Sequence, residues 1–130
     1  MLESIAVLLV ALLFGGMVLY SFGFAAFIFK NLPADLAGPT IRKAFPHFYL
    51  FVMATALVAT PVLWGVSTMG AVLMAVIALT TLPTRQLLMP AINRATDAGQ
   101  KTRFKWLHTA SVLITLAHMV LAAIVLISLT

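Results

Sequence analysis

The chain has 130 residues, of which 63% are hydrophobic and only 8% are charged, and its net charge is +5. A soluble domain of this length needs far more polar surface, so the composition favours the lipid bilayer as solvent. The chain has no cysteine, which excludes disulfides, thiolate metal sites, iron–sulfur clusters and cysteine nucleophiles.

The first apolar segment covers residues 5–29 and is long enough to cross a bilayer, which takes about 20 apolar residues. It is not typical of a cleaved secretory signal, because Glu3 is the only early charge and Lys30 is the first basic residue. We therefore predict a retained transmembrane helix over residues 5–29.

One face of this helix is expected to carry a stripe of residues about one turn apart. Its members are Gly16, Tyr20, Gly23 and Phe27. Glycines at this spacing let another helix or a flat ligand approach closely, and close helix packing is the commoner use. The Tyr20 hydroxyl needs a hydrogen-bond partner at this depth, for which we consider Thr115 and His118.

The next apolar stretch, residues 45–82, is too long for one span, because a single helix of that length would measure about 55 Å. Glycines and hydroxyl residues cluster at 65–70, which predicts a tight turn. We therefore predict helices near 46–66 and 69–89, followed by a fourth near 104–128.

The polar segments between these helices, 31–44 and 90–104, are expected to form short helix extensions and turns at the membrane surface. Pro46 and Pro90 are expected at helix edges, where proline is tolerated. Pro61 and Pro83 fall inside predicted helices, where each removes a backbone hydrogen bond and favours a kink.

The eight Lys and Arg residues lie in two segments, one between the first two helices and one around the junction of the last two. With four spans, both segments fall on one side, and all bases obey the positive-inside rule if that side is the cytoplasm. The predicted fold is therefore an all-α integral membrane bundle of one domain, 1–130, with both termini on the non-cytoplasmic side. Trp64 and Trp106 are expected near opposite membrane interfaces.

The fourth helix has a narrow polar stripe, because its polar residues are three, four and three positions apart. They are His108, Ser111, Thr115 and His118. Lipid cannot satisfy these groups, so the stripe is expected to face the bundle interior. Either its side chains bond neighbouring helices and determine the packing, which is the commoner case, or a histidine binds a metal, haem b or a proton.

A haem site would need more than the fourth helix, because His108 and His118 are about three turns apart and cannot hold one iron together. His47 is expected at the depth of His108 and would be the ligand from another helix. A Cu(I) site would use His118, Met17 and Met53, since thioethers and imidazole suit this ion. Methionine is also an ordinary filler of apolar cores.

A second group of polar residues is expected at the cytoplasmic rim. It comprises Arg42, Lys43, His47, Arg85, Arg94, Asp97 and Arg103. Arg85 lies within one turn of apolar sequence, so it is expected to reach lipid phosphates, to pair with Asp97 or to hold an anionic ligand. Because the chain has only three acids, anionic lipid headgroups are the expected counter-ions of most bases.

The sequence carries no enzyme signature, neither a glycine-rich phosphate loop nor a zinc-protease helix motif. Its acids, Glu3, Asp35 and Asp97, are expected outside the membrane or at the rim. This arrangement disfavours a carboxylate-driven transporter. The basic segments between apolar runs indicate a membrane setting and no nucleic-acid partner.

Three tracts of the chain resemble the membrane proteins grouped as domain of unknown function 4149, the transmembrane protein 205-like family. They are residues 15–29, the RKAFPHFY run at 42–49, and residues 83–111, with Phe104, Leu107, His108 and Ser111 opening the fourth helix. The resemblance implies a four-helix membrane fold whose role is largely undefined. Thr115 stands near a position where the family often has Asn, and residues 24–27 lack a proline that the family often has.

The layout is also similar to the copper-resistance D-like and haem-binding protoporphyrinogen-oxidase-like four-helix proteins, a likeness that does not determine function. The leading hypothesis is a small non-enzymatic protein of a bacterial inner (plasma) membrane. It would bind a lipid, a small ligand or a membrane partner through its interior stripe and basic rim, as a homo-oligomer or within a larger complex. The alternatives are a haem- or metal-binding redox protein and a copper or small-solute transporter.

Overall fold

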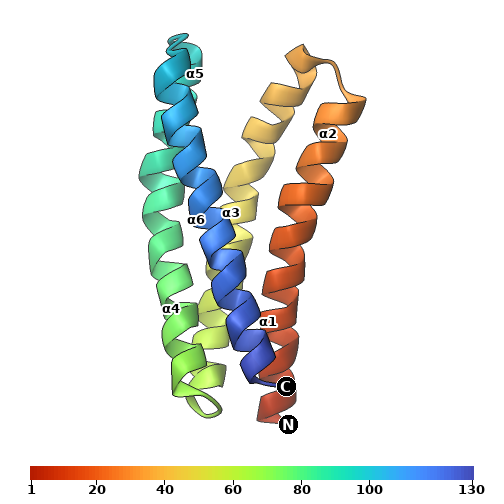
Figure 1. Ribbon diagram of the computed structural model, residues 1–130, viewed down its shortest axis with the longest axis vertical. Coiled ribbons are helices and arrows are strands. Elements are labelled where there is room, and N and C mark those ends of the chain that lie inside the picture. The colour runs from red at the N-terminus through yellow and green to blue at the C-terminus, as the bar shows by residue number, and fades with distance from the viewer.

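The computed structural model describes residues 1–130 and contains helices and turns but no strands. Four helices, of 28 to 31 residues, are long and apolar enough to cross a membrane. They run alternately in opposite directions, and both termini lie at the same end (Figure 1). The prediction of an all-helical membrane protein with four spans is therefore confirmed.

The four spans are built from eight helical elements. The first span, Leu2–Asn31, joins α1 (Leu2–Val18), the π-helical segment η1 (Leu19–Phe24) and α2 (Ala25–Asn31). The second span is the single helix α3 (Ala34–Trp64). The third span, Thr68–Asp97, joins α4 (Thr68–Pro83), the π-helical segment η2 (Thr84–Leu88) and α5 (Met89–Asp97). The fourth span is α6 (Lys101–Ser128).

The helices extend further toward their polar ends than the sequence suggested. The segments 31–44 and 90–104 are mostly helical, and the helices are interrupted only at residues 32–33 and 98–100. Gly99 has a φ of 66° in the second of these turns, a conformation that glycine adopts without strain. The expected turn at 65–70 lies at residues 65–67, where the Ser67 hydroxyl caps α4 by accepting a bond from the Gly70 amide (3.1 Å).

The placement of Pro46 at a helix edge was wrong, because Pro46 lies well inside α3. Pro90 lies in the first turn of α5 as expected, although the third span continues through it. A proline removes one backbone hydrogen bond, whereas ending the helix there would leave several backbone groups without partners near the membrane. Pro61 and Pro83 lie inside helices as expected, and the π-helical segment η2 begins directly after Pro83.

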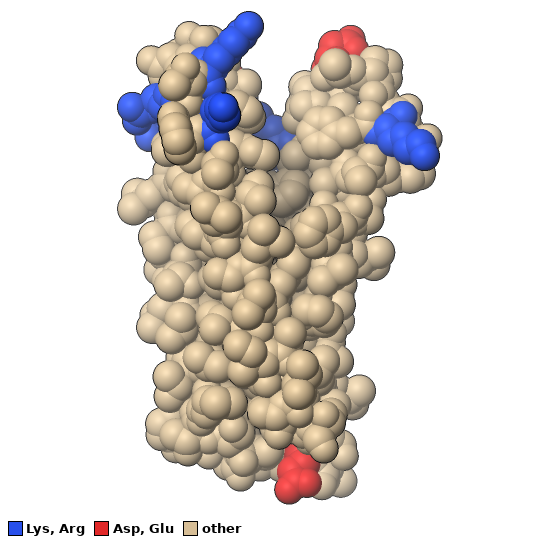
Figure 2. All heavy atoms as spheres, viewed as in Figure 1, with Lys and Arg blue, Asp and Glu red and all other residues tan.

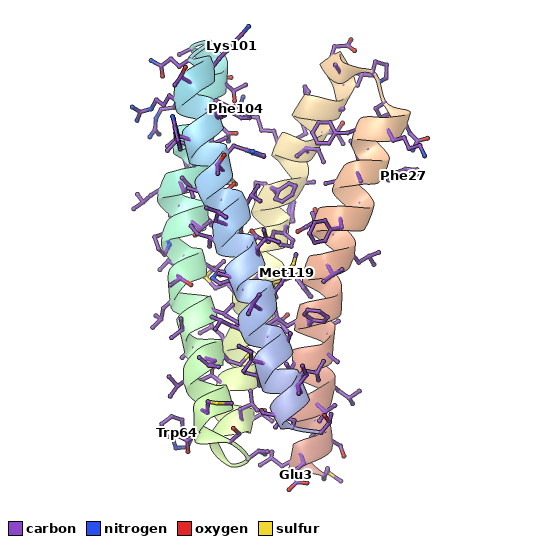
Figure 3. All side chains as sticks on the ribbon, in the orientation of Figure 1. Glu3, Phe27, Trp64, Lys101, Phe104 and Met119 are labelled. Carbon is purple, nitrogen blue, oxygen red and sulfur yellow. The ribbon has the colours of Figure 1, made fainter.

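The two ends of the bundle differ in charge. Glu3 and Trp64 lie at one end, near the 65–67 turn and the termini, whereas Lys101 and Phe104 lie at the other (Figure 3). On the visible face every Lys and Arg lies at this second end (Figure 2). We call the first end the turn pole and the second the basic pole. The exposed Trp64 and Trp106 lie near opposite poles, as aromatic interface residues should.

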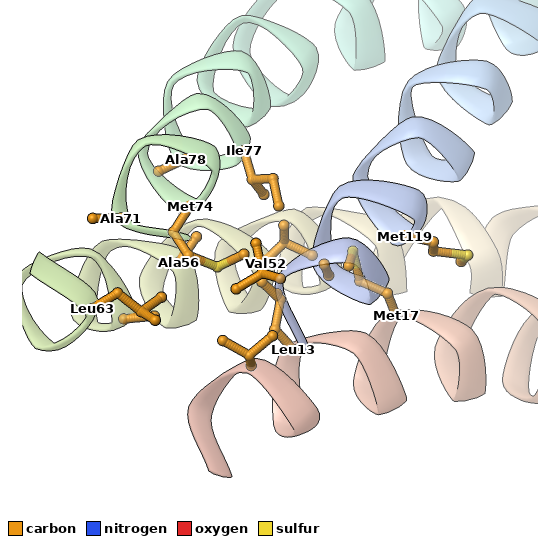
Figure 4. Close-up of a cluster of buried hydrophobic side chains, with 14 of the residues drawn as sticks. Leu13, Met17, Val52, Ala56, Leu63, Ala71, Met74, Ile77, Ala78 and Met119 are labelled. Carbon is orange, nitrogen blue, oxygen red and sulfur yellow. The ribbon is translucent and has the colours of Figure 1, made fainter. Parts of the chain in front are cut away.

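Small side chains allow the spans to approach one another in the core. The second span packs on the first and third, and the fourth packs on the same two, so the helices form a closed ring. Leu13, Val52 and Met74 meet between them (Figure 4). Close approach is possible because several core positions are alanines with no exposed surface, which are Ala6, Ala56, Ala59, Ala71 and Ala122.

The two π-helical segments lie on either side of α3 near Pro46. A π-helical turn closes its backbone bond one residue later than an α-turn, as the amides of Ala25 and Met89 do with the carbonyls of Tyr20 and Thr84. From η1, the Tyr20 hydroxyl donates to the Ala44 carbonyl (2.8 Å). From η2, Arg85 Nε donates to the Pro46 carbonyl (3.1 Å).

An aromatic cluster surrounds this level of the bundle. The Tyr20 ring lies 4.9 Å from Phe24, 5.7 Å from Phe45 and 5.1 Å from Phe48, measured between ring centroids. Phe45 and Phe48 also contact Tyr49, with centroid distances of 6.1 and 5.4 Å. These rings join the first span to α3, and beyond them α2 and the start of α6 diverge toward the basic pole (Figure 1).

Replacing Gly16 by leucine is expected to destabilise the bundle by about 1–3 kcal/mol, because an added Cβ would lie 2.5 Å from the Phe51 ring. Gly15→Leu is the matched control, since nothing lies within 4 Å of its added Cβ. Thermal unfolding of both variants in the same mild detergent measures the difference. Equal melting temperatures for the two variants would contradict the close packing of α1 on α3.

Candidate functional site: the polar interior and the basic pole

The polar stripe of α6 faces the bundle interior over most of its length. Ser111 and His118 are buried and Thr115 is half-buried. His108, one turn closer to the basic pole, is exposed although it continues the same stripe. Its ring stacks on Phe104, with the ring centroids 5.3 Å apart. The inner face of α6 is therefore covered by other spans below His108 and uncovered from there to the pole.

The buried part of the stripe is bonded within the protein. Ser111 Oγ donates to the carbonyl of His108 (2.7 Å). The phenol of Tyr49, on α3, lies close enough to the hydroxyls of Ser111 and Thr115 to interact with both. These contacts tie α6 to α3. Sequence reasoning missed Tyr49, although a phenol in an apolar span must find a partner and this requirement was the available signal.

His118 is held by a hydroxyl of the third span. Its Nε2 lies 2.7 Å from Thr80 Oγ1, which in turn lies 2.7 Å from the carbonyl of Val76. A hydroxyl has a single proton, and the Val76 carbonyl accepts it, so Nε2 carries the ring proton and donates to Thr80. Thr80 was not among the predicted site residues, and this contact makes His118 part of the packing between α6 and α4.

The expected partners of Tyr20 were wrong. Its hydroxyl donates to the Ala44 carbonyl of α3, and neither Thr115 nor His118 bonds to it. The prediction that Gly16, Tyr20, Gly23 and Phe27 share one face of the first span was also wrong. Gly16 packs against Phe51, whereas Gly23 and Phe27 are exposed. The reason is η1, whose wider turn changes the rotation per residue, while the prediction assumed a regular α-helix.

The three histidines lie in three different surroundings. The carbonyls of Ala44 and Pro46 accept bonds from the first and third spans, respectively. Successive helix residues are rotated by about 100°, so Phe45, between them, faces inward and His47 faces outward. His47 is exposed accordingly. His108 stacks on Phe104, and His118 bonds to Thr80. No group of three or more His, Asp and Glu side chains is placed to hold a metal ion.

The proposed copper ligands are also not gathered at one point. Met17 is fully buried in the apolar core, whereas Met53 is half-buried and does not pack against that core cluster. His118 already uses Nε2 for Thr80. In this structure the candidate side chains form neither a bis-histidine haem site nor a thioether–imidazole copper site.

One ion pair joins two spans at the basic pole. The Arg42 guanidinium bonds the Asp97 carboxylate in a bidentate manner, with distances of 2.7 and 3.0 Å, and so connects α3 to α5. Both side chains are about half exposed, so the pair stabilises the fold by at most about 1 kcal/mol. Arg85 bonds to Pro46 and Gln86, so the pairing of Arg85 with Asp97 that we considered does not form.

Arg85 is held in place without any negative charge beside it. It is half-buried, its Nε donates to the Pro46 carbonyl, and its Nη1 donates to Gln86 Oε1 (2.8 Å). Its Nη2 has no hydrogen-bond partner in the protein. The other basic members of the predicted rim, Lys43, Arg94 and Arg103, are exposed and lack a carboxylate partner.

The spans enclose a hollow at the basic pole. Figure 2 shows it between the end of the bundle formed by α2 and α3 and the end formed by α5 and α6. Toward this pole α3 changes from the buried Phe48 to the half-buried Phe45 and the exposed Gly38, although Ala37 beside Gly38 is buried. A Cβ added at Gly38 would meet nothing within 4 Å. On α6 the stripe changes from buried at Ser111 to exposed at His108.

Comparison with known proteins gives the family. The family model described as a domain of unknown function (DUF4149) matches residues 8–101, more than half of the chain. The match includes Tyr20, Tyr49 and Arg85 and ends at the first residue of α6, before the polar stripe. Neither the curated proteins nor the solved structures contain a match. The match to the family model shows that the chain belongs to the family with domain of unknown function 4149.

Proposed function

We propose that this protein is a non-enzymatic membrane protein whose basic pole faces the cytoplasm and binds anionic phospholipid headgroups. One observation carries the proposal: of the eight Lys and Arg residues, only Arg42 pairs with a carboxylate. Basic residues beside an anionic membrane surface contribute about 1 kcal/mol each to the attraction. A pole with this many free cations therefore binds acidic headgroups more strongly than neutral ones.

The hydrogen bonds inside the bundle favour a function at the basic pole over ligand binding or catalysis in the interior. In the α6 stripe His118 bonds to α4, Ser111 bonds to its own backbone, and both Ser111 and Thr115 lie beside Tyr49 of α3, so these side chains supply helix packing. Of the Lys and Arg residues at the pole, only Arg42 has a carboxylate partner. The charge asymmetry also supports a bacterial inner (plasma) membrane with both termini on the non-cytoplasmic side, since that topology satisfies the positive-inside rule.

The orientation can be measured by cysteine labelling, because the chain has no native cysteine. Thr68 and Gln100 are exposed at the turn pole and the basic pole, respectively. In intact spheroplasts a membrane-impermeant maleimide is expected to label Thr68→Cys and to leave Gln100→Cys unmodified. After permeabilisation both should react. Labelling of Gln100→Cys alone in intact spheroplasts would reverse the proposed topology.

Headgroup binding can be measured with the two native tryptophans, which lie near opposite poles. Trp64→Phe leaves only Trp106 at the basic pole, and Trp106→Phe leaves only Trp64 at the turn pole. In vesicles of phosphatidylcholine and phosphatidylglycerol, brominated phosphatidylglycerol is expected to quench Trp106 more than brominated phosphatidylcholine does. The excess should decrease with added salt, because screening weakens exposed charge pairs.

Trp64 is the control in the same vesicles and should show no excess quenching by the anionic lipid, since no base lies at its pole. An equal excess at both tryptophans, or none at Trp106, would overturn the proposed headgroup binding.

A further inference from the structure

We infer that the hollow at the basic pole binds one anionic phospholipid headgroup, with its phosphate held by Arg85 and His108. This inference rests on the proposed function and adds a specific site to it. Most of the basic pole is a diffuse surface of exposed cations. The site assigned to the hollow differs because it would combine a fixed, half-buried guanidinium, an exposed imidazole and aromatic rings.

The depth of the hollow matches the headgroup layer of a membrane. Spans of about 30 residues measure roughly 45 Å, whereas the hydrocarbon core is about 30 Å thick. At the turn pole the helices end close to Trp64, an interface residue, so the surplus length lies at the basic pole. About 20 residues from the turn pole, the hydrocarbon boundary falls near Ala44 in α3, Leu88 in the third span and His108 in α6.

The floor of the hollow therefore lies at that boundary, and the hollow itself lies among the headgroups. A phosphate is the group that a phospholipid places at this depth. The hollow is open on the face drawn in Figure 2, which would give a lipid lateral access from the bilayer. Acyl chains would remain outside, against the exposed apolar side chains of the spans, such as Leu19 and Phe22.

Arg85 has the geometry of an anion ligand. Its bonds to the Pro46 carbonyl and to Gln86 hold the guanidinium in one orientation, so little side-chain entropy is lost when an anion binds. Nη2 has no protein partner and is free to donate. Partial burial lowers the local dielectric and strengthens a guanidinium–phosphate contact, which exposed bases such as Arg94 form in water.

His108 adds a second donor from the opposite side. It lies on the inner stripe of α6, and α6 contacts η2, the segment that contains Arg85. Stacking on Phe104 orients the ring, and no protein group accepts a bond from its nitrogens. Tyr20 and Phe45 form the aromatic wall between the first span and α3, where a glycerol backbone would pack.

Phospholipid phosphorus that remains bound after purification in mild detergent tests the site. Wild-type protein from membranes of phosphatidylcholine and phosphatidylglycerol is expected to retain phosphatidylglycerol, about one per chain, through a high-salt wash, since a partly buried contact is screened little. Arg85→Gln should weaken retention on the order of tenfold or more, as expected for loss of one charge-assisted hydrogen bond. His108→Leu should weaken it less.

Arg94→Gln is the matched control, because it removes the same charge from an exposed rim position outside the hollow. It should retain the lipid as the wild type does. Far-ultraviolet circular dichroism and the melting temperature of lipid-free protein verify that each variant is folded. If Arg85→Gln fails to fold, Arg85→Lys and His108→Leu test the site instead, and normal retention in both would overturn it.

Two further outcomes separate this inference from the proposed function. If Trp106 still senses excess phosphatidylglycerol while Arg85→Gln and Arg94→Gln retain lipid equally, the hollow is not the site and headgroup binding stays a property of the whole pole. If Trp106 senses no excess, both proposals fail. A third experiment adds glycerol phosphate in solution as a competitor of the bound lipid. Displacement of bound lipid at millimolar glycerol phosphate would assign the hollow to a soluble phosphate and overturn the lipid assignment.

Discussion

The hydrocarbon core offers no hydrogen-bond partner, and this constraint decides where the polar side chains of the bundle lie. Tyr20 donates to a backbone carbonyl of α3, Ser111 donates to its own helix, and His118 bonds to Thr80. Each bond requires the donor to face a neighbouring span or its own backbone, so the bonds determine which faces of the helices meet. Ser21 Oγ, in η1, is the one buried side-chain atom that lacks a partner.

The same constraint explains the unusual local structure near Pro46. Proline leaves this part of α3 without one amide donor, while Tyr20 and Arg85 approach neighbouring carbonyls from the two π-helical segments. A π-helical turn changes the rotation of all residues that follow it relative to a regular α-helix, here those of α2 and α5. The hollow lies at the end of the bundle that α2 and α5 reach (Figure 1).

The contrast between the interior and the pole separates two kinds of polar residue. Inside, His118 bonds to Thr80, while Ser111 and Tyr20 bond to backbone carbonyls, which makes these side chains structural. Those at the pole are cationic and exposed or half-buried, and only Arg42 among them has a carboxylate partner. Of the histidines predicted as ligands, His118 belongs to the first kind, whereas His47 and His108 are exposed near the basic pole.

The sequence by itself determined the class of this protein, its four spans and the collection of bases at one pole. These properties follow from composition, apolar run length and charge position, which need no knowledge of contacts. It also placed Ser111 and His118 inside, since helical periodicity is local. Only the tertiary structure decided which groups these side chains bond to. The span that lies beside a polar face depends on the packing of all four helices. Tyr49 and Thr80 entered the interior network in this way, while Tyr20 found Ala44 and the first-span stripe was broken by η1.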